Sequence, residues 1–445
     1  MKPAGTAPLN QAEKNTPVKN PVTALVADAR GKIFELEGYG AVGMAGKVLT
    51  PLTGDQMIPM PHGSELMMLP DRAPVLFNLE RQRLETIHDN PFRPKEAIFP
   101  VAAFHSPGYM NAFTCAYEER ASAGILPLFA YGAVGWQRNG FQSAVIRVDK
   151  ERRQDLRLMP LEKVKTGVKQ MRSQMPANRL RRHLEKCALT YGCPAAKNFF
   201  LGRFEAPLPT ARQCNAGCLG CISLQKKETG VSSPQERIDF EPTPDEISEI
   251  AVRHIRRVRN GVVSFGQGCE GDPLLAADVI IPAIRQIRRI TSAGTIHMNT
   301  NGSRTDILDR LFDAGLDSVR ISINSFRPEC YHAYFNPAGY GFENVMASIA
   351  LAGKRGKFVS INYLNCPGVT DAPEEVRALL DCLDRHPVNM IQWRNLNYDP
   401  LRYWRMMDTA AHLGRPTGMR ILLQTVQRRF PAVRHGYFNP PRENS

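Results

Sequence analysis

Apolar and polar residues alternate in short stretches over the first third of the chain. Between residues 23 and 149, brief apolar runs are separated by glycines, prolines and polar turns. The runs 133–137 and 141–147 flank Arg138-Asn139-Gly140, and Asn-Gly favours a hairpin because both residues tolerate the positive φ of a primed turn. We predict a small β-rich domain over residues 23–150, preceded by a flexible polar tail over residues 1–22.

The pattern changes to a helical period over residues 160–190. One apolar face consists of Val164, Val168 and Met171, and a second consists of Leu180, Leu184, Cys187 and Ala188. This spacing is typical of amphipathic helices. Pro176 lies between the two segments that carry these faces, and proline cannot continue a helix. We therefore expect two helices within a helical connector over residues 151–200.

Apolar strands then alternate with amphipathic helices, which favours an α/β fold with a parallel sheet over residues 201–400. Thr243-Pro244-Asp245-Glu246 combines an N-cap, a proline at the first helical position and a capping-box glutamate, so a helix is expected to begin there. Residues 401–445 are assigned to a C-terminal extension. The strands that we predict are one just before Cys214 and those at 261–265, 295–299, 318–324, 358–364 and 389–397.

Composition narrows the class of protein. The chain has 445 residues, 43% of them hydrophobic, so it can bury sizeable cores, and no apolar run reaches the eighteen or so residues of a membrane span. Ten cysteines without a secretion signal favour a reducing compartment, and we expect a cytoplasmic protein with no membrane partner. The net charge of +14 favours anionic partners, although its basic runs are also typical of solvated helix faces.

Three cysteines constrain the chemistry most tightly. Cys214, Cys218 and Cys221 form a CxxxCxxC spacing. Three thiolates on one loop can hold three irons of a four-iron cluster, whose fourth iron then has no protein ligand. The alternatives are a zinc knuckle or unrelated thiols, but no nearby cysteine or histidine follows Cys221 before His254 to complete a zinc site.

The CxxxCxxC run resembles the signature of the radical S-adenosylmethionine (radical SAM) superfamily. The resemblance implies a partial (β/α)6 barrel, a [4Fe-4S] cluster and bound SAM. It also implies an enzyme that cleaves SAM reductively to a 5'-deoxyadenosyl radical, which abstracts hydrogen from a substrate. An electron donor such as flavodoxin or ferredoxin is then expected as a partner.

Further motifs after the predicted strands agree with this resemblance. Glu270-Gly271-Asp272-Pro273 is similar to the family's Gly-Gly-Glu-Pro motif, with Asp272 in place of the glutamate, so either Glu270 or Asp272 is expected to hold the SAM amino group. The resemblance also assigns SAM contacts to Thr300, Ser322 and Asn324. Two interpretations of Arg394 are open: it pairs with a carboxylate of SAM or of the substrate, or it completes a structural ion pair.

The substrate stays open. The nearest comparison is with pyruvate formate-lyase activating enzyme and its relatives, which act on protein, and the positive charge favours RNA as an alternative. A non-catalytic iron-sulfur scaffold is the third interpretation.

A second metal site is a further hypothesis. His183 and Cys187 lie four residues apart on one predicted helix, with Cys193 just beyond it. Packing of two core cysteines explains the same pattern. Any fourth ligand has to come through the fold, and the candidates are Cys269, Cys330 and Cys366.

Overall fold

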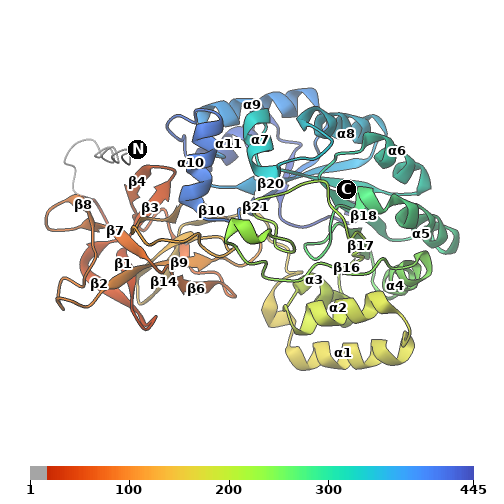
Figure 1. The fold of residues 1–445 in the computed structure, drawn as a ribbon, viewed down its shortest axis with the longest axis horizontal. Helices are drawn as coiled ribbons and strands as arrows, with labels where there is room; N and C mark the ends of the chain where they lie inside the picture. Colours follow the sequence, from red (N-terminus) through yellow and green to blue (C-terminus); the bar gives the residue numbers. More distant parts are fainter. Residues whose placement is uncertain (1–17, 445) are drawn as a thin grey trace. The chain divides into compact units, whose positions relative to one another are not determined.

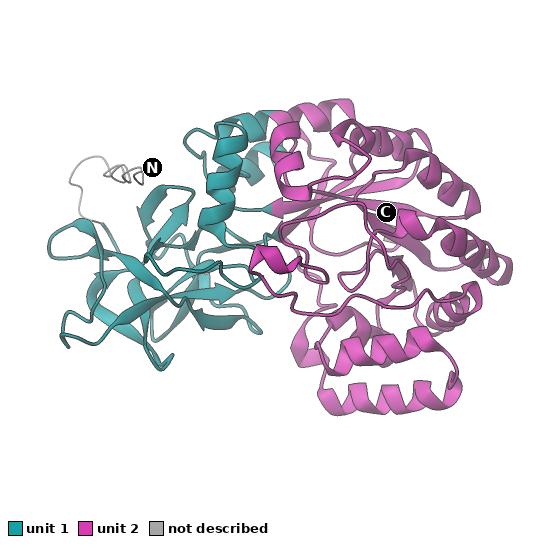
Figure 2. Ribbon diagram, viewed as in Figure 1, with its two compact units in different colours: residues 1–147, 365–377, 395–428 teal, residues 148–364, 378–394, 429–445 magenta. Residues whose placement is uncertain are grey.

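The structure is a computed structural model in which residues 18–444 are described. It divides into two compact units, which Figure 2 shows in separate colours. One consists of residues 1–147, 365–377 and 395–428, and the other of residues 148–364, 378–394 and 429–445. Residues 1–17 of the predicted tail lie outside the described residues.

Antiparallel strands make up most of the first unit, as the sequence predicted. A sheet of thirteen strands runs in the order β12-β7-β2-β1-β9-β13-β11-β3-β4, with β5, β6, β8 and β14 paired off this path, while β10 and β15 form a separate pair. The strands are β1 (Thr23–Asp28), β2 (Ile33–Gly40), β3 (Val42–Ala45), β4 (Val48–Pro51), β5 (Ile58–Pro59), β6 (Glu65–Met68), β7 (Arg72–Asn78), β8 (Arg83–Thr86), β9 (Ile98–Phe104), β10 (Tyr109–Asn111), β11 (Thr114–Cys115), β12 (Tyr117–Glu119), β13 (Gly132–Gln137), β14 (Gly140–Ser143) and β15 (Val145–Arg147).

The predicted hairpin forms between β13 and β14, where Gln137 pairs with Gly140. Its two turn residues are Arg138 and Asn139, with φ of 53° and 57°. The turn therefore lies one residue earlier than the Asn-Gly pair indicated. Positive φ at both central positions matches the twist of the flanking strands.

A buried carboxylate attaches a C-terminal helix to the sheet of this unit. Asp399 caps α10 (Pro400–Ala410), and its side chain is fully buried. It accepts hydrogen bonds from Arg72 Nη2 at 2.9 Å and from Tyr117 Oη at 2.8 Å. Because an unpaired buried charge is costly, this pairing explains why residues 395–428, including α11 (Met419–Arg429), group with the β-rich unit.

The second unit contains the parallel sheet. Its seven strands pair in chain order, and helices that connect them lie along the outer side of the sheet (Figure 1). The strands are β16 (Glu205–Pro207), β17 (Val262–Phe265), β18 (Thr295–Thr300), β19 (Ser318–Ile323), β20 (Phe358–Asn365), β21 (Met390–Asn395) and β22 (Arg434–Gly436). The six predicted strands are present within a few residues, and β22 is an additional seventh.

The helices also follow the predicted pattern. Val164, Val168 and Met171 are buried in α1, and Thr243 and Glu246 form the expected capping box of α4. None of the helices in the described part of the chain is long and apolar enough to cross a bilayer. The helices of this unit are α1 (Leu161–Gln174), α2 (Arg179–Leu189), α3 (Pro194–Leu201), α4 (Pro244–Arg257), α5 (Ala277–Ile290), α6 (Thr305–Ala314), α7 (Pro328–Phe335), α8 (Phe342–Lys354) and α9 (Pro373–Arg385), the last of which begins in the first unit.

Candidate functional site

The three cysteines lie on the loop that follows β16, and all three thiols are half-buried. Backbone hydrogen bonds hold this loop against the end of α7. Gly217 N donates to Phe335 O at 2.9 Å, and Leu219 N donates to Tyr334 O at 3.1 Å. The path of the loop is therefore set by main-chain contacts, independently of any bound group.

Two side chains organise the interior of the loop. The amide of Gln225 donates to the carbonyls of Leu219 and Cys221, both at 2.9 Å. Arg237 Nη2 lies 3.6 Å from Cys221 Sγ. Hydrogen bonds to a cluster's sulfurs tune its reduction potential, so Arg237 is placed to influence a cluster held here.

The electrostatics of the thiols fit a cationic iron centre. Burial, followed by the charge of Asp272, raises the pKa of Cys214 to about 11. Burial, together with the charges of Cys214 and Cys221, raises the pKa of Cys218 well above its usual value. Three converging thiolates are thus unfavourable without a positive charge between them, which metal binding supplies.

The loop after β17 packs directly against the cysteine loop. Gly271 N donates to Ala211 O at 2.7 Å, and Asp272 N donates to Gln213 O at 2.9 Å. A Cβ added at Gly271 would lie 1.8 Å from Gln213 O, a distance that no side chain permits. Glycine at this position is required by the close approach of the two backbones.

The buried carboxylate of Glu270 accepts only backbone amides among its described partners. Thr210 N and Ala211 N donate to Oε2 at 2.7 and 2.9 Å, and Gln267 N donates to Oε1 at 2.6 Å. Burial raises the pKa of Glu270 to about 7, although these bonds oppose the shift. Glu270 therefore joins the two loops.

Asp272 has a different environment. Its carboxylate caps the turn of 3₁₀ helix at Pro273–Ala276 through Leu274 N at 3.0 Å. It also accepts from Thr300 Oγ1 at 2.8 Å and from Asn301 N at 2.6 Å. Burial raises the pKa of Asp272, and its charge contributes to the raised pKa values of the Cys214 and Cys218 thiols. Of the two carboxylates proposed for SAM, Asp272 is thus the one near the cysteines, together with Thr300.

Of the other two polar residues predicted on β19 and just beyond it, only one reaches across the strands. Ser322 Oγ accepts from Asn362 Nδ2 of β20 at 3.2 Å. Asn324 is fully buried, and its amide donates to Cys330 O in α7 at 3.0 Å. Part of the hydrogen-bonding capacity of Asn324 is therefore used within the fold.

Arg394 makes no ion pair among residues 18–444. Its guanidinium stacks 3.8 Å from the centroid of the Tyr437 ring, and Nη2 donates to Tyr437 O at 2.7 Å. The structural ion pair that the sequence left open is therefore not formed within the described chain. The buried Nε of Arg394 also lacks a hydrogen-bond partner.

Arg320 was missed by the sequence analysis. It shares one face of β19 with Ser318 and Ser322, while Val319 and Ile321 on the opposite face are buried. Its Nη1 donates to Gln392 Oε1 at 2.7 Å, and its buried Nε has no partner among residues 18–444. The alternation of polar and apolar residues along 318–323 could have identified Arg320, because it places Arg320 on the same face as Ser322.

Burial and the charge of Arg394 lower the pKa of Arg320 to about 9, so the group remains protonated at neutral pH. The positive charges of Arg320 on β19 and Arg394 on β21 therefore repel each other. Neither guanidinium forms an ion pair within the described residues.

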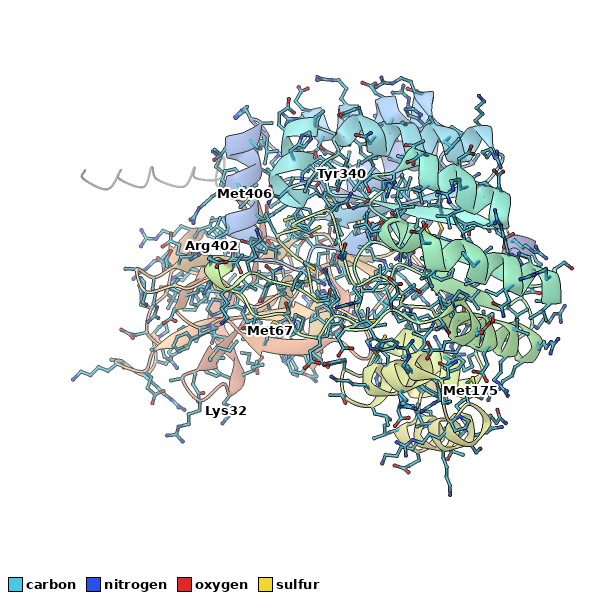
Figure 3. The ribbon with its side chains drawn as sticks, turned by 45° about the vertical axis from the view of Figure 1, so that its right-hand side comes forward. Lys32, Met67, Met175, Tyr340, Arg402 and Met406 are labelled. Atoms are coloured by element: carbon cyan, nitrogen blue, oxygen red, sulfur yellow. The ribbon has the colours of Figure 1, made fainter. Side chains whose placement is uncertain are left out.

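Two tyrosines near the cysteine loop were also missed. Tyr340, labelled in Figure 3, precedes α8, and its hydroxyl lies 3.2 Å from that of Tyr331 in α7. Burial raises the pKa of both phenols, with smaller contributions from the charges of Cys218 and Asp272. Aromatic spacing in the sequence gave no sign of this pair.

Comparison with known proteins bears on the cysteine-containing segment. The family model described as the radical SAM superfamily matches residues 208–381. The chain is 27% identical over 185 residues to GTP 3',8-cyclase of Limosilactobacillus fermentum, covering 40% of this chain and 50% of that protein. It is 26% identical over 188 residues to GTP 3',8-cyclase of Microcystis aeruginosa, covering 41% and 53%.

Among solved structures, the radical SAM methyltransferase TsrM from Kitasatospora setae is 14% identical, with a TM-score of 0.34 and coverage of 45% of this chain and 39% of that one. The match to the family model confirms the resemblance inferred from the cysteine spacing. Residues 208–381 are a radical SAM domain. The chain spans about half the length of the curated relatives that it matches.

Gly271→Ala is expected to separate the two loops, because its Cβ meets backbone atoms that cannot move aside. Trypsin should then cut after the exposed Arg212 faster than in the unchanged protein, as measured by mass spectrometry of the released peptides. Gly268→Ala is the matched control, since a Cβ there meets only the movable ends of side chains, Ile222 Cδ1 at 2.7 Å and Gln235 Nε2 at 3.2 Å. Equal cleavage rates in both variants would contradict this account of the packing.

Proposed function

We propose that this chain is a radical SAM enzyme in which Cys214, Cys218 and Cys221 ligate a [4Fe-4S] cluster. The observation that carries the proposal is the backbone interlock between the cysteine loop and the loop containing Asp272. When bound, the cluster supplies the electron for reductive cleavage of SAM. An electron donor such as flavodoxin or ferredoxin is part of the same proposal.

The chain's own residues then have distinct roles. Asp272 is assigned to the SAM amino group because its partner Thr300 is a hydroxyl that can rotate away. The described partners of Glu270, by contrast, are backbone amides. Ser322 is assigned to the ribose or carboxylate of SAM because it lies near the carboxyl end of β19, the end at which βα folds bind ligands.

Loss of any one cluster ligand is expected to abolish SAM cleavage. Cys214→Ala, Cys218→Ala and Cys221→Ala should each yield no 5'-deoxyadenosine after anaerobic reconstitution and incubation with SAM and dithionite. Cys382→Ala is the matched control, because Cys382 is a buried cysteine on α9, outside the loop. Cleavage retained in any of the three ligand variants would overturn the proposal.

Asp272→Asn is expected to weaken SAM binding about 10- to 100-fold, the value of one charge-assisted hydrogen bond. The asparagine can still cap the turn, so iron content should not change. Equilibrium dialysis with labelled SAM measures the affinity. Unchanged SAM affinity in Asp272→Asn would contradict the assignment of this carboxylate.

The arginine pair favours an anionic substrate. Arg320 and Arg394 are half-buried cations that form no ion pair in the described residues, and the charge of the buried Glu205 offsets the burial of Arg320 only in part, because the pKa of Arg320 is still lowered to about 9. Burying such charges is costly unless an anion compensates them. A nucleoside triphosphate satisfies this requirement, and the relatives named GTP 3',8-cyclase make GTP the first candidate. A protein or RNA substrate has to place an anionic group at the same two residues.

GTP is expected to raise the melting temperature of the reconstituted protein, and Arg320→Met and Arg394→Met should each reduce that shift. SAM affinity is measured in the same variants, because the carboxylate of SAM is the competing partner for Arg394. A GTP effect that persists in both variants would contradict the assignment of the arginines. Loss of SAM affinity with no GTP effect in the unchanged protein would assign the pair to SAM.

A further inference from the structure

A second group of metal-binding side chains lies beside the radical SAM loops. It consists of His183 and Cys187 on α2 and Cys269 in the loop after β17. The three donor atoms all lie within 4.8 Å of one another, and Cys187 Sγ is 3.5 Å from His183 Nε2. Among the described residues, no other set of three such donors is this compact.

The spacing suits a single ion. Zinc binds sulfur at about 2.3 Å and imidazole nitrogen at about 2.0–2.1 Å, so tetrahedral ligand atoms lie about 3.3–3.8 Å apart. The observed donors therefore need only small adjustments to surround one zinc ion. Cys214, Cys218 and Cys221 do not form so compact a group, as expected of ligands that hold the corners of a larger cluster.

Cys193 is the candidate for a fourth ligand whose backbone contacts α2. It precedes α3 as its N-cap, and its backbone N–H donates to Cys187 O at 2.9 Å. Its thiol is not part of the group within 4.8 Å, so it has to move toward the other three donors to bind the same ion. Cys330 and Cys366, the other candidates from the sequence, lie outside the group of three.

We propose that His183, Cys187 and Cys269, with Cys193 as the fourth ligand, bind one structural zinc ion. The ion would join the helical connector to the loop that carries Glu270 and Asp272. Cys269 immediately precedes Glu270, and its carbonyl accepts from Ile238 N at 2.8 Å. The metal would thus fix the segment that directly precedes Glu270.

Two other states fit the same residues. Cys187 and Cys269 are close enough for a hydrogen bond between their thiols, so they could instead form a disulfide, which is rare in a reducing compartment. They could also be packed free thiols, since both are buried. The ring of His183 packs edge-on against Phe240, yet its Nε2 is directed at Cys187 Sγ, which is expected of a metal ligand.

The test uses the full chain with Cys214, Cys218 and Cys221 replaced by alanine, so that the iron-sulfur cluster does not contribute. After anaerobic purification, elemental analysis should find about one zinc per chain, as expected for a single site. Adding Cys187→Ser or Cys269→Ser should remove it, whereas Cys330→Ala and Cys366→Ala should retain it. Cobalt(II) bound in place of zinc should show thiolate-to-metal charge-transfer absorption.

His183→Ala keeps the test decisive if the cysteine variants fail to fold, because His183 lies at the surface of α2 and is half-buried. Competition with a chelator should show a loss of zinc affinity larger than the roughly 10- to 100-fold that an outer-shell partner typically contributes. Metal-free protein with free thiols, or a Cys187–Cys269 disulfide in non-reducing peptide maps, would overturn the zinc proposal. Neither result depends on SAM cleavage, so the proposed enzymatic function is tested separately.

Discussion

The contact between the loops after β16 and β17 is the constraint on which the site depends. Gly271 lies so close to Gln213 O that no side chain fits between them, and Glu270 draws backbone amides of both loops onto one carboxylate. Each loop alone carries only part of the chemistry: cysteines on one, acidic side chains on the other. Their interlock gives the thiols and Asp272 a fixed relation before any cofactor binds, which is the condition for a preorganised site.

The two neighbouring carboxylates illustrate how burial separates roles. Both are buried and both have raised pKa values, yet the described partners of Glu270 are main-chain donors, whereas Asp272 also contacts a rotatable hydroxyl. A side chain held by fixed amides serves structure. One that can exchange a hydroxyl for an ammonium group can serve binding. The family's glutamate is replaced at the motif position by the shorter Asp272, and the nearby Glu270 then holds the loop in place.

Much of this arrangement could be predicted from the sequence because its signals are local. Buried parallel strands are apolar runs, and the CxxxCxxC spacing lies on one loop. The strand β22 was missed because Arg434, His435 and Gly436 have no apolar pattern, and they form a strand only against β21. Cys269 was one of three candidates for the second metal group, since the choice depends on a contact between residues more than eighty positions apart. Arg320 was missed because its strand was searched for small polar residues.

Three groups of buried or half-buried ionisable side chains in the parallel-sheet unit share one property: the surrounding protein satisfies each of them only in part. Cys214 and Cys218, both with raised pKa values, share one loop with Cys221. Two arginines lie inside the sheet without ion pairs in the described chain, and a histidine and two cysteines meet beside the loop after β17. A fold that needed only stability would replace such groups by apolar ones at little cost. Each group has a proposed partner: iron for the thiols, an anion for the arginines and zinc for the third group. The energetic cost of these groups in the unliganded chain therefore indicates what the chain is built to bind.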